Sequence, residues 1–291
     1  MKAISSNLLD INPRMNINKF NVGSAVITDT FNNGFTPLHH AAMQEHLAVV
    51  KYFTKCLLEK NPSEDNDKSV MYLAAEEQQL EIVEHYLDIL SDGKKNPKAN
   101  AIDDAYKGRT PLHAAAQSSS LEIIKAINAH LTDINPGDAH GYTPLHLASE
   151  DGHLHIVRYL IDQIKDINPP AYDFFVGATL YYQAASHGYL DIVELYLQKL
   201  PKSDVNPGLR STNPVYQGKT PLHAAAENGY LDIVKAISKH LTNLSPKNAL
   251  GTTPLILAVE NGHLAIVKYF VETLKDINPA GGEFYKNRTL L

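Results

Sequence analysis

Apolar and polar positions recur along this chain in one fixed order. The phrase Thr-Pro-Leu-His or a relative of it begins at seven positions, which are Thr36, Ser69, Thr110, Thr143, Thr179, Thr220 and Thr253. Small residues, a polar turn and an apolar stretch follow each start. In the sixth copy the apolar set is close to the 3.6-residue period of a helix, with Leu231, Ile233, Val234, Ile237 and Leu241. Each copy therefore predicts two helices joined by a turn.

Residues with special backbone properties predict where these helices begin and end. Thr at the start can cap a helix N-terminus, and Pro in the first turn loses no needed hydrogen bond. Gly229 lies in the polar turn, where a left-handed residue ends a helix. Each copy ends in Asn-Pro, except for Ser245-Pro246, and this dipeptide favours extended or turn backbone. A glycine then predicts a tight turn before the next copy, at Gly108, Gly141, Gly218 and Gly251.

A single helix pair cannot bury its own apolar face, so the copies must stack on one another. We expect the leucines of the repeated phrases, such as Leu145 and Leu222, to be buried between layers. The block at 143–158, TPLHLASEDGHLHIVR, resembles the ankyrin repeat, and the resemblance covers residues 36–288. It implies an all-α solenoid of stacked helix-turn-helix pairs with inter-repeat hairpin loops. It also implies a concave binding face made by the first helices and the hairpin tips.

The chain departs from the family pattern at one position of every copy. Ankyrin repeats usually carry Gly at the end of the second helix. Here that position is apolar throughout, with Leu57, Leu90, Leu131, Ile164, Leu200, Leu241 and Leu274. We expect the second helix to end differently, with an extra apolar contact.

The phrases divide the chain into a partial repeat with a long loop at 1–35 and seven repeats over 36–288. The repeats are 36–68, 69–109, 110–142, 143–178, 179–219, 220–252 and 253–288. Residues 289–291 read as the start of a further repeat. Copies three apart are more alike than neighbours, which indicates a longer period of three repeats. Residues 2–13 match the tail of the third copy, so the chain reads either as a piece of a longer array or as a short protein with degenerate end copies.

Composition narrows the possible partners and compartments. The formal net charge of −6 argues against a nucleic-acid partner, because proteins that bind nucleic acid usually carry a basic stripe. The single cysteine makes an internal disulfide impossible. The first twenty residues lack an apolar signal core, and no apolar run is long enough to span a bilayer. We expect a monomeric, cytoplasmic protein that is not inserted in a membrane.

Fourteen histidines raise the question of a metal site. Four of them occupy the same position of different copies, where Tyr72, Tyr182 and Ile256 stand in the others; they are His39, His113, His146 and His223. A position that accepts Ile predicts packing and hydrogen bonding rather than metal ligation. The chain has no Gly-rich phosphate loop and no hydrolase or zinc-protease motif. We predict no catalytic, metal or cofactor-binding residues, and an inert thiol at Cys56.

Two groups of residues are candidates for partner binding. The first is acidic and recurs at the end of the first helix, and it includes Glu150, Asp151, Glu227 and Glu260. These residues favour a basic partner or simply form a solvated face. The second group comprises loop aromatics and bases before the first helices, which are Tyr106, Arg109, Tyr142, Phe174, Phe175, Tyr216 and Lys219. Tyr and Arg are typical of interface hot spots; the alternative is that these rings pack under their own loops.

The predicted function is a non-catalytic scaffold that binds a protein through the concave face and the inter-repeat loops. The alternative is the targeting arm of a larger enzyme or effector whose catalytic domain lies outside this chain. The long loops 93–109 and 201–219 recur with the three-repeat period. They predict two equivalent contacts to a repetitive or two-headed partner, unless they were copied with the array and have no role.

Overall fold

The computed structural model describes residues 35–57, 60, 61, 63, 68–98, 107–168, 178–209, 211, 213 and 215–274. The chain divides into two compact units, Met1–Leu147 and Ala148–Leu291. Fourteen α-helices and no strand lie in the described residues; one isolated antiparallel bridge joins Ser63 and Ser69. The predicted all-α solenoid is confirmed.

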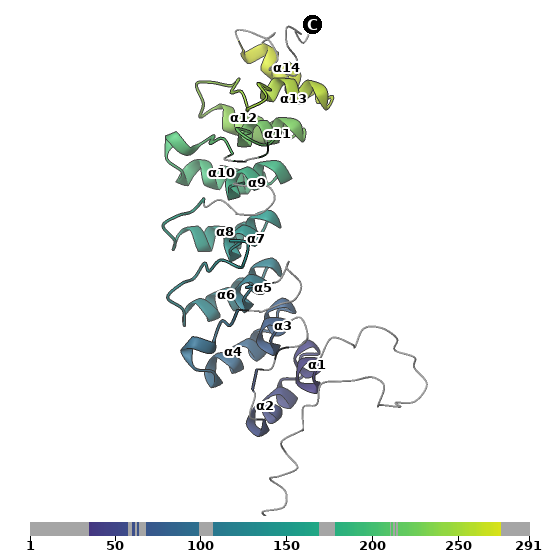
Figure 1. Cartoon of the computed structure of the whole chain (residues 1–291), viewed down its shortest axis with the longest axis vertical. Helices are drawn as coiled ribbons and strands as arrows, with labels where there is room; N and C mark the ends of the chain where they lie inside the picture. The colour runs from purple at the N-terminus through teal and green to yellow at the C-terminus, as the bar shows by residue number, and fades with distance from the viewer. Residues whose placement is uncertain are drawn as a thin grey trace, which may run out of the picture. The chain divides into compact units, whose positions relative to one another are not determined.

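The first unit contains three helix pairs, and each pair consists of a short first helix and a longer second helix. The pairs are α1 (Pro37–Met43) with α2 (Leu47–Cys56), α3 (Val70–Glu76) with α4 (Leu80–Ile89), and α5 (Pro111–Gln117) with α6 (Leu121–Asn128). A 3-10 turn, η3 (Asp92–Lys94), follows α4. First helices pack against first helices and second helices against second helices, which makes two layers (Figure 1).

The second unit repeats this arrangement. After α8 (Leu154–Ile161) its pairs are α9 (Leu180–His187) with α10 (Leu190–Lys199), α11 (Pro221–Glu227) with α12 (Leu231–Ser238), and α13 (Pro254–Glu260) with α14 (Leu264–Thr273). A 3-10 turn, η5 (Lys202–Asp204), follows α10. The layers are again α9, α11 and α13 on one side and α8, α10, α12 and α14 on the other. The remaining helix, α7 (Pro144–Glu150), crosses the boundary between the units.

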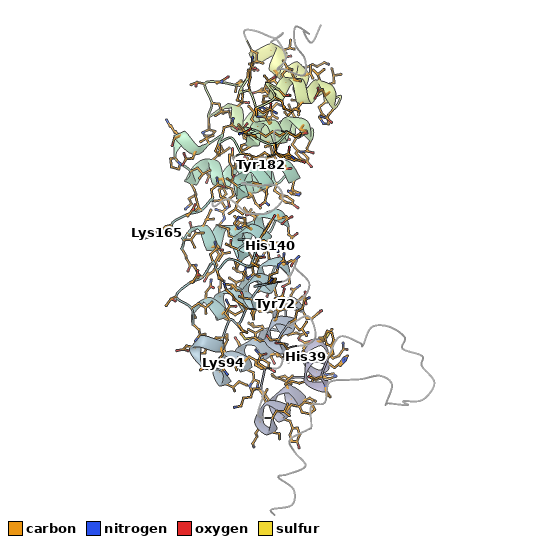
Figure 2. All side chains as sticks on the ribbon, in the orientation of Figure 1. His39, Tyr72, Lys94, His140, Lys165 and Tyr182 are labelled. Atoms are coloured by element: carbon orange, nitrogen blue, oxygen red, sulfur yellow. The ribbon has the colours of Figure 1, made fainter. Side chains whose placement is uncertain are left out.

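The core of each unit lies between its layers, because the apolar residues of the repeated phrases point there. Leu145 and Leu222 are completely buried, as predicted. Small side chains such as Ala115 and Ala225 are also fully buried, and they let neighbouring first helices approach closely. The largest fully buried side chains include four tyrosines, with Tyr72 and Tyr181 on first helices; Figure 2 shows Tyr72 on α3.

The turns follow the predicted backbone conformations. Gly108 and Gly218 have φ of 79° and 77° in the inter-repeat turns, and Gly229 has φ of 84° after α11. At the turn between the two helices, Glu45, Gln78 and Ser119 take the same left-handed conformation without being glycine. A side chain in this conformation costs about 1–2 kcal/mol.

The apolar residue that replaces glycine after each second helix is half-buried in all seven copies. At four of them, Leu57, Leu90, Leu200 and Leu274, the residue is the C-cap in an extended conformation. The second helix therefore ends without a left-handed residue, and the side chain contributes apolar burial instead. This is the different ending that the sequence predicted.

Candidate functional site on the first helices

The first helices α1, α5, α7 and α11 each begin with a threonine and a histidine that cap the helix together. In α5 the Thr110 N–H donates to Nδ1 of His113 over 3.1 Å, and in α11 the Thr220 N–H donates to Nδ1 of His223 over 3.1 Å. Because a backbone N–H can only donate, Nδ1 is the acceptor and the proton of the neutral ring lies on Nε2. The predicted packing and hydrogen-bonding role of these histidines is confirmed.

The other ring nitrogen of His113 and of His223 bonds to the residue that immediately precedes the next repeat. Nε2 of His113 donates to the carbonyl oxygen of Tyr142 over 3.0 Å, and Nε2 of His223 donates to that of Thr252 over 3.1 Å. Burial lowers the pKa of His113 to about 3 and the pKa of His223 to about 4. Both imidazoles are therefore neutral linkers between layers at physiological pH.

Five of the Asn-Pro dipeptides supply an asparagine that caps the next first helix, which the sequence did not reveal. Its side-chain oxygen accepts a hydrogen bond from the backbone N–H of the second helical residue of the following repeat. The pairs are Asn61 with Met71, Asn96 with Leu112, Asn135 with Leu145, Asn168 with Tyr181, and Asn206 with Leu222. Asn96 and Asn206, near the beginning of the two long loops, are therefore each tied to the helix that follows the loop.

The predicted bases before the first helices are engaged within the chain. Lys219 is buried, and its Nζ lies 2.7 Å from Oε2 of Glu227 and 5.4 Å from the centre of the Tyr216 ring. Arg109 contacts two acceptors, with Nε 3.5 Å from Oδ2 of Asp138 and Nη1 donating to Oε1 of Gln117. The structure thus brings together three of the predicted site residues, Tyr216, Lys219 and Glu227, in one cluster.

The other predicted residues that the structure describes lie at or next to α7 and α13, not in that cluster. Tyr142 is half-buried, and its ring lies edge-on to His146 with 5.6 Å between ring centres. Glu150 ends α7 and is half-buried, whereas Asp151 and Glu260 are exposed. Tyr106, Phe174 and Phe175 lie outside the described residues.

A row of rings along the turns of the second unit was not predicted. We call the segments from the last residue of each first helix to the second residue of each second helix, 150–155, 187–191, 227–232 and 260–265, the turn edge. The ring of Tyr189 lies against Gly152, that of Tyr230 against Gly188, and that of His263 against Gly229. A Cβ on any of these three glycines would approach a ring atom to 2.7–2.8 Å. Each of these glycines makes room for a ring of the next layer. A glycine in a predicted turn does not by itself reveal such a contact.

No group of three or more His, Cys, Asp or Glu in the described part of the chain is arranged to hold a metal ion. Cys56 is a free, partly buried thiol. Among the described helices, none is both long enough and apolar enough to cross a bilayer.

A family model described as "Ankyrin repeats (3 copies)" matches residues 1–95, 85–171 and 181–280. These matches cover most of the sequence, and the structure adds the stacked helix pairs. The chain belongs to the ankyrin-repeat family. No curated protein matched the sequence. Ankyrin repeats are generally protein–protein interaction modules and are typically non-catalytic.

Several first helices end in an acidic residue, which is electrostatically unfavourable at a helix C-terminus. Four first helices end in glutamate, namely α3, α7, α11 and α13. A negative charge at a helix C-terminus interacts unfavourably with the helix dipole and destabilises the helix by roughly 0.3–1 kcal/mol. Lys68 and Lys219 offset this for Glu76 and Glu227, at 3.0 and 2.7 Å. The helix dipole by itself therefore does not favour glutamate at this position.

Proposed function

We propose that this ankyrin-repeat protein is a non-catalytic scaffold that binds a protein partner across the first-helix layer and the loops that lead into it. The observation that carries the proposal is the recurrence of glutamate at the C-terminal ends of first helices, within a family of interaction modules. Those carboxylates oppose the helix dipole, so a role in recognition accounts for them better than a role in stability.

The residues that we propose contact the partner are the ones whose side chains are exposed. Asp151 and Glu260 present carboxylates to solvent, while half-buried Tyr142 precedes α7 and half-buried Glu150 ends it. Lys219 and Glu227 bind each other, so they shape the face rather than contact a partner first. Tyr106, Phe174 and Phe175 remain proposed loop contacts. The proposal includes a monomer in the cytoplasm with no nucleic-acid ligand and no membrane insertion; the single cysteine and the net charge of −6 support it.

The test is capture of a partner followed by mapping of the contact. The immobilised chain is used as bait, candidate partners are purified, and binary binding is measured by calorimetry. A carboxylate–amine cross-linker then reports which glutamates and aspartates touch the partner. We expect cross-links from Asp151 and Glu260, and few from the exposed Glu194 and Glu272 on the second helices. A partner that contacts only the second-helix layer contradicts the proposed face.

A further inference from the structure

Helix α2 exposes an apolar face at the end of the first unit. It packs on α4, and α4 packs on α6, so α2 ends this row of second helices (Figure 1). Val49 of α2 is 41% exposed and Tyr52 is 61% exposed. In each of the other six copies the position of Val49 holds an isoleucine that is at most 1% exposed. The exposed face of α2 is therefore one that the other copies bury.

The last repeat gives a direct comparison for α2. Residues 47–53 read LAVVKYF, and residues 264–270 of α14 read LAIVKYF. In α14, which packs on the preceding second helix α12, Ile266 is 1% exposed and Phe270 is fully buried. Phe53, the counterpart of Phe270, is only half-buried. Two helices of nearly the same sequence thus differ in burial, and the one with the buried face has a preceding second helix beside it.

The chain carries a matching piece of that preceding helix in its first residues. Residues 2–5 read KAIS, and so does the last turn of α12, residues 235–238. The match continues without a gap to Pro13 and Pro246. In this alignment Ile4 corresponds to Ile237, which is fully buried, and Leu8 corresponds to Leu241, which is half-buried. Sequence from both sides of the contact between α12 and α14 therefore recurs at the start of the chain.

The phrase Asp-Ile-Asn-Pro supplies a second, independent point of attachment. In the described residues it occurs at 133–136 and 166–169. In both places the aspartate side chain accepts the N–H of the asparagine, over 3.1 and 3.2 Å. The asparagine side chain then accepts the N–H of the second residue of the next first helix, Leu145 or Tyr181. The phrase is thus a compact turn that ties the end of one repeat to the start of the next.

Residues 10–13 repeat this phrase before α1, whose second residue is Leu38. We propose that the segment 2–13 of this chain docks on the first repeat, where its apolar residues cover the exposed face of α2 and Asn12 caps α1 by accepting the Leu38 N–H. The described caps span 10, 13 and 16 residues, so the cap does not depend on one loop length. The docking stands independently of the proposed scaffold function.

Hydrogen exchange of the full chain tests the cap. N12A should speed exchange at the start of α1 by about tenfold, because the helix loses a capping acceptor. N135A is the reference, since it removes a described cap, and it should have the same effect at the start of α7. N7A is the matched control, because it removes the same residue type from the same segment, and it should leave α1 unchanged. Equal exchange in N12A and N7A overturns the cap.

Nitration of tyrosines with tetranitromethane, read by peptide mass spectrometry, tests the contact with α2. I4D/L8D should speed nitration of Tyr52 at least about threefold, because a charged segment no longer packs on an apolar face. S6D/N7D adds the same charge at positions whose counterparts, Lys239 and His240, are exposed, and it should leave the rate unchanged. Tyr269, at the same position of α14, is the internal reference and should react equally in every variant.

The outcomes separate this segment from other occupants of the α2 face. If Tyr52 reacts as fast in the native chain as in I4D/L8D, the segment does not cover α2 and the docking is rejected. If Tyr52 slows only as the protein concentration rises, a second copy covers the face instead. Hydrogen exchange in α9–α14 should be the same in all segment variants, because each repeat contacts only its neighbours, and this shows that the variants remain folded.

Discussion

At the scale of single residues, the inter-repeat asparagines are the most informative side chains. Asn135 and Ser245 are both followed by proline, and each lies ten residues before the second residue of the next first helix. Asn135 accepts the Leu145 N–H over 3.1 Å, whereas Oγ of Ser245 is buried without a partner in the described residues. A serine hydroxyl lies one bond closer to the backbone than an amide oxygen, so it does not reach the helix.

We therefore expect Ser245→Asn to stabilise the protein by about 1 kcal/mol, because it supplies an acceptor for the Leu255 N–H. Urea unfolding measures the change. The converse variant, Asn135→Ser, should lose a similar amount and serves as the matched control. A neutral Ser245→Asn together with a destabilising Asn135→Ser would show that the last loop holds its helix in some other way.

A cationic residue precedes α5 and another precedes α11, and their carboxylate partners lie at different positions of the sequence. Arg109 lies near Asp138 of the next repeat, and residue 117 is the neutral Gln117. Lys219 pairs instead with Glu227 at the end of α11, and Asn248 stands at the position that corresponds to Asp138. Each cation thus has one carboxylate partner, which lies either in the turn after the second helix or at the end of the first helix.

This exchange predicts compensation. D138N should destabilise the first unit by roughly 1 kcal/mol, because Arg109 loses its partner while the turn keeps an oxygen acceptor. Adding Q117E should restore most of that loss and keep the net charge at the native value. The double-mutant cycle in urea gives the coupling energy. A coupling energy near zero would mean that solvent screens Arg109 and that the exchange has no energetic basis.

At the scale of elements, the first helix is the unit of stacking. Leu222 is completely buried on α11, which packs against α9, α12 and α13. Leu222→Ala should cost about 2–5 kcal/mol, since a cavity is left between layers. Hydrogen exchange should show the loss of protection mainly in α9–α14, because each repeat contacts only its neighbours. Leu145→Ala is the equivalent variant on α7, and an unchanged unfolding curve for both would place these leucines outside the core.

At the scale of the whole molecule, the buried histidines set the response to acid. Free histidine has a pKa of about 6.5, while those of His113 and His223 in the folded chain are about 3 and 4. Between these values the unfolded chain binds a proton at each site and the folded chain does not. The free energy of unfolding should therefore fall as pH falls below 6.5, by up to about 1.4 kcal/mol per pH unit for each histidine, and level off only below the folded pKa.

The chain itself suggests a control variant for this pH dependence. Ile256 occupies the histidine position in α13, so His223→Ile should fold and should flatten the dependence by one histidine. Urea unfolding between pH 7 and pH 4 measures both proteins. An identical slope for the variant and the native protein would show that other groups govern the acid response.

The sequence by itself determined the fold class and the positions where the first helices begin. Thr-Pro caps, left-handed glycines and the helical period are local signals, and a periodic chain of helix pairs has no way to bury its apolar faces except by stacking. It also indicated that the repeated histidines pack and form hydrogen bonds, because Tyr182 and Ile256 share their position. These properties depend on residues near one another in the chain.

Only the tertiary structure decided which side chains meet across layers. Asn96 caps a helix sixteen residues away, Tyr230 covers Gly188, and Lys219 is buried against Glu227 rather than presented at a loop end. The sequence identified Lys219 and Glu227 as separate candidates, because their pairing depends on how the loop before α11 folds back on the helix. Exposure and pairing are properties of neighbouring layers in space, so spacing along the chain does not fix them.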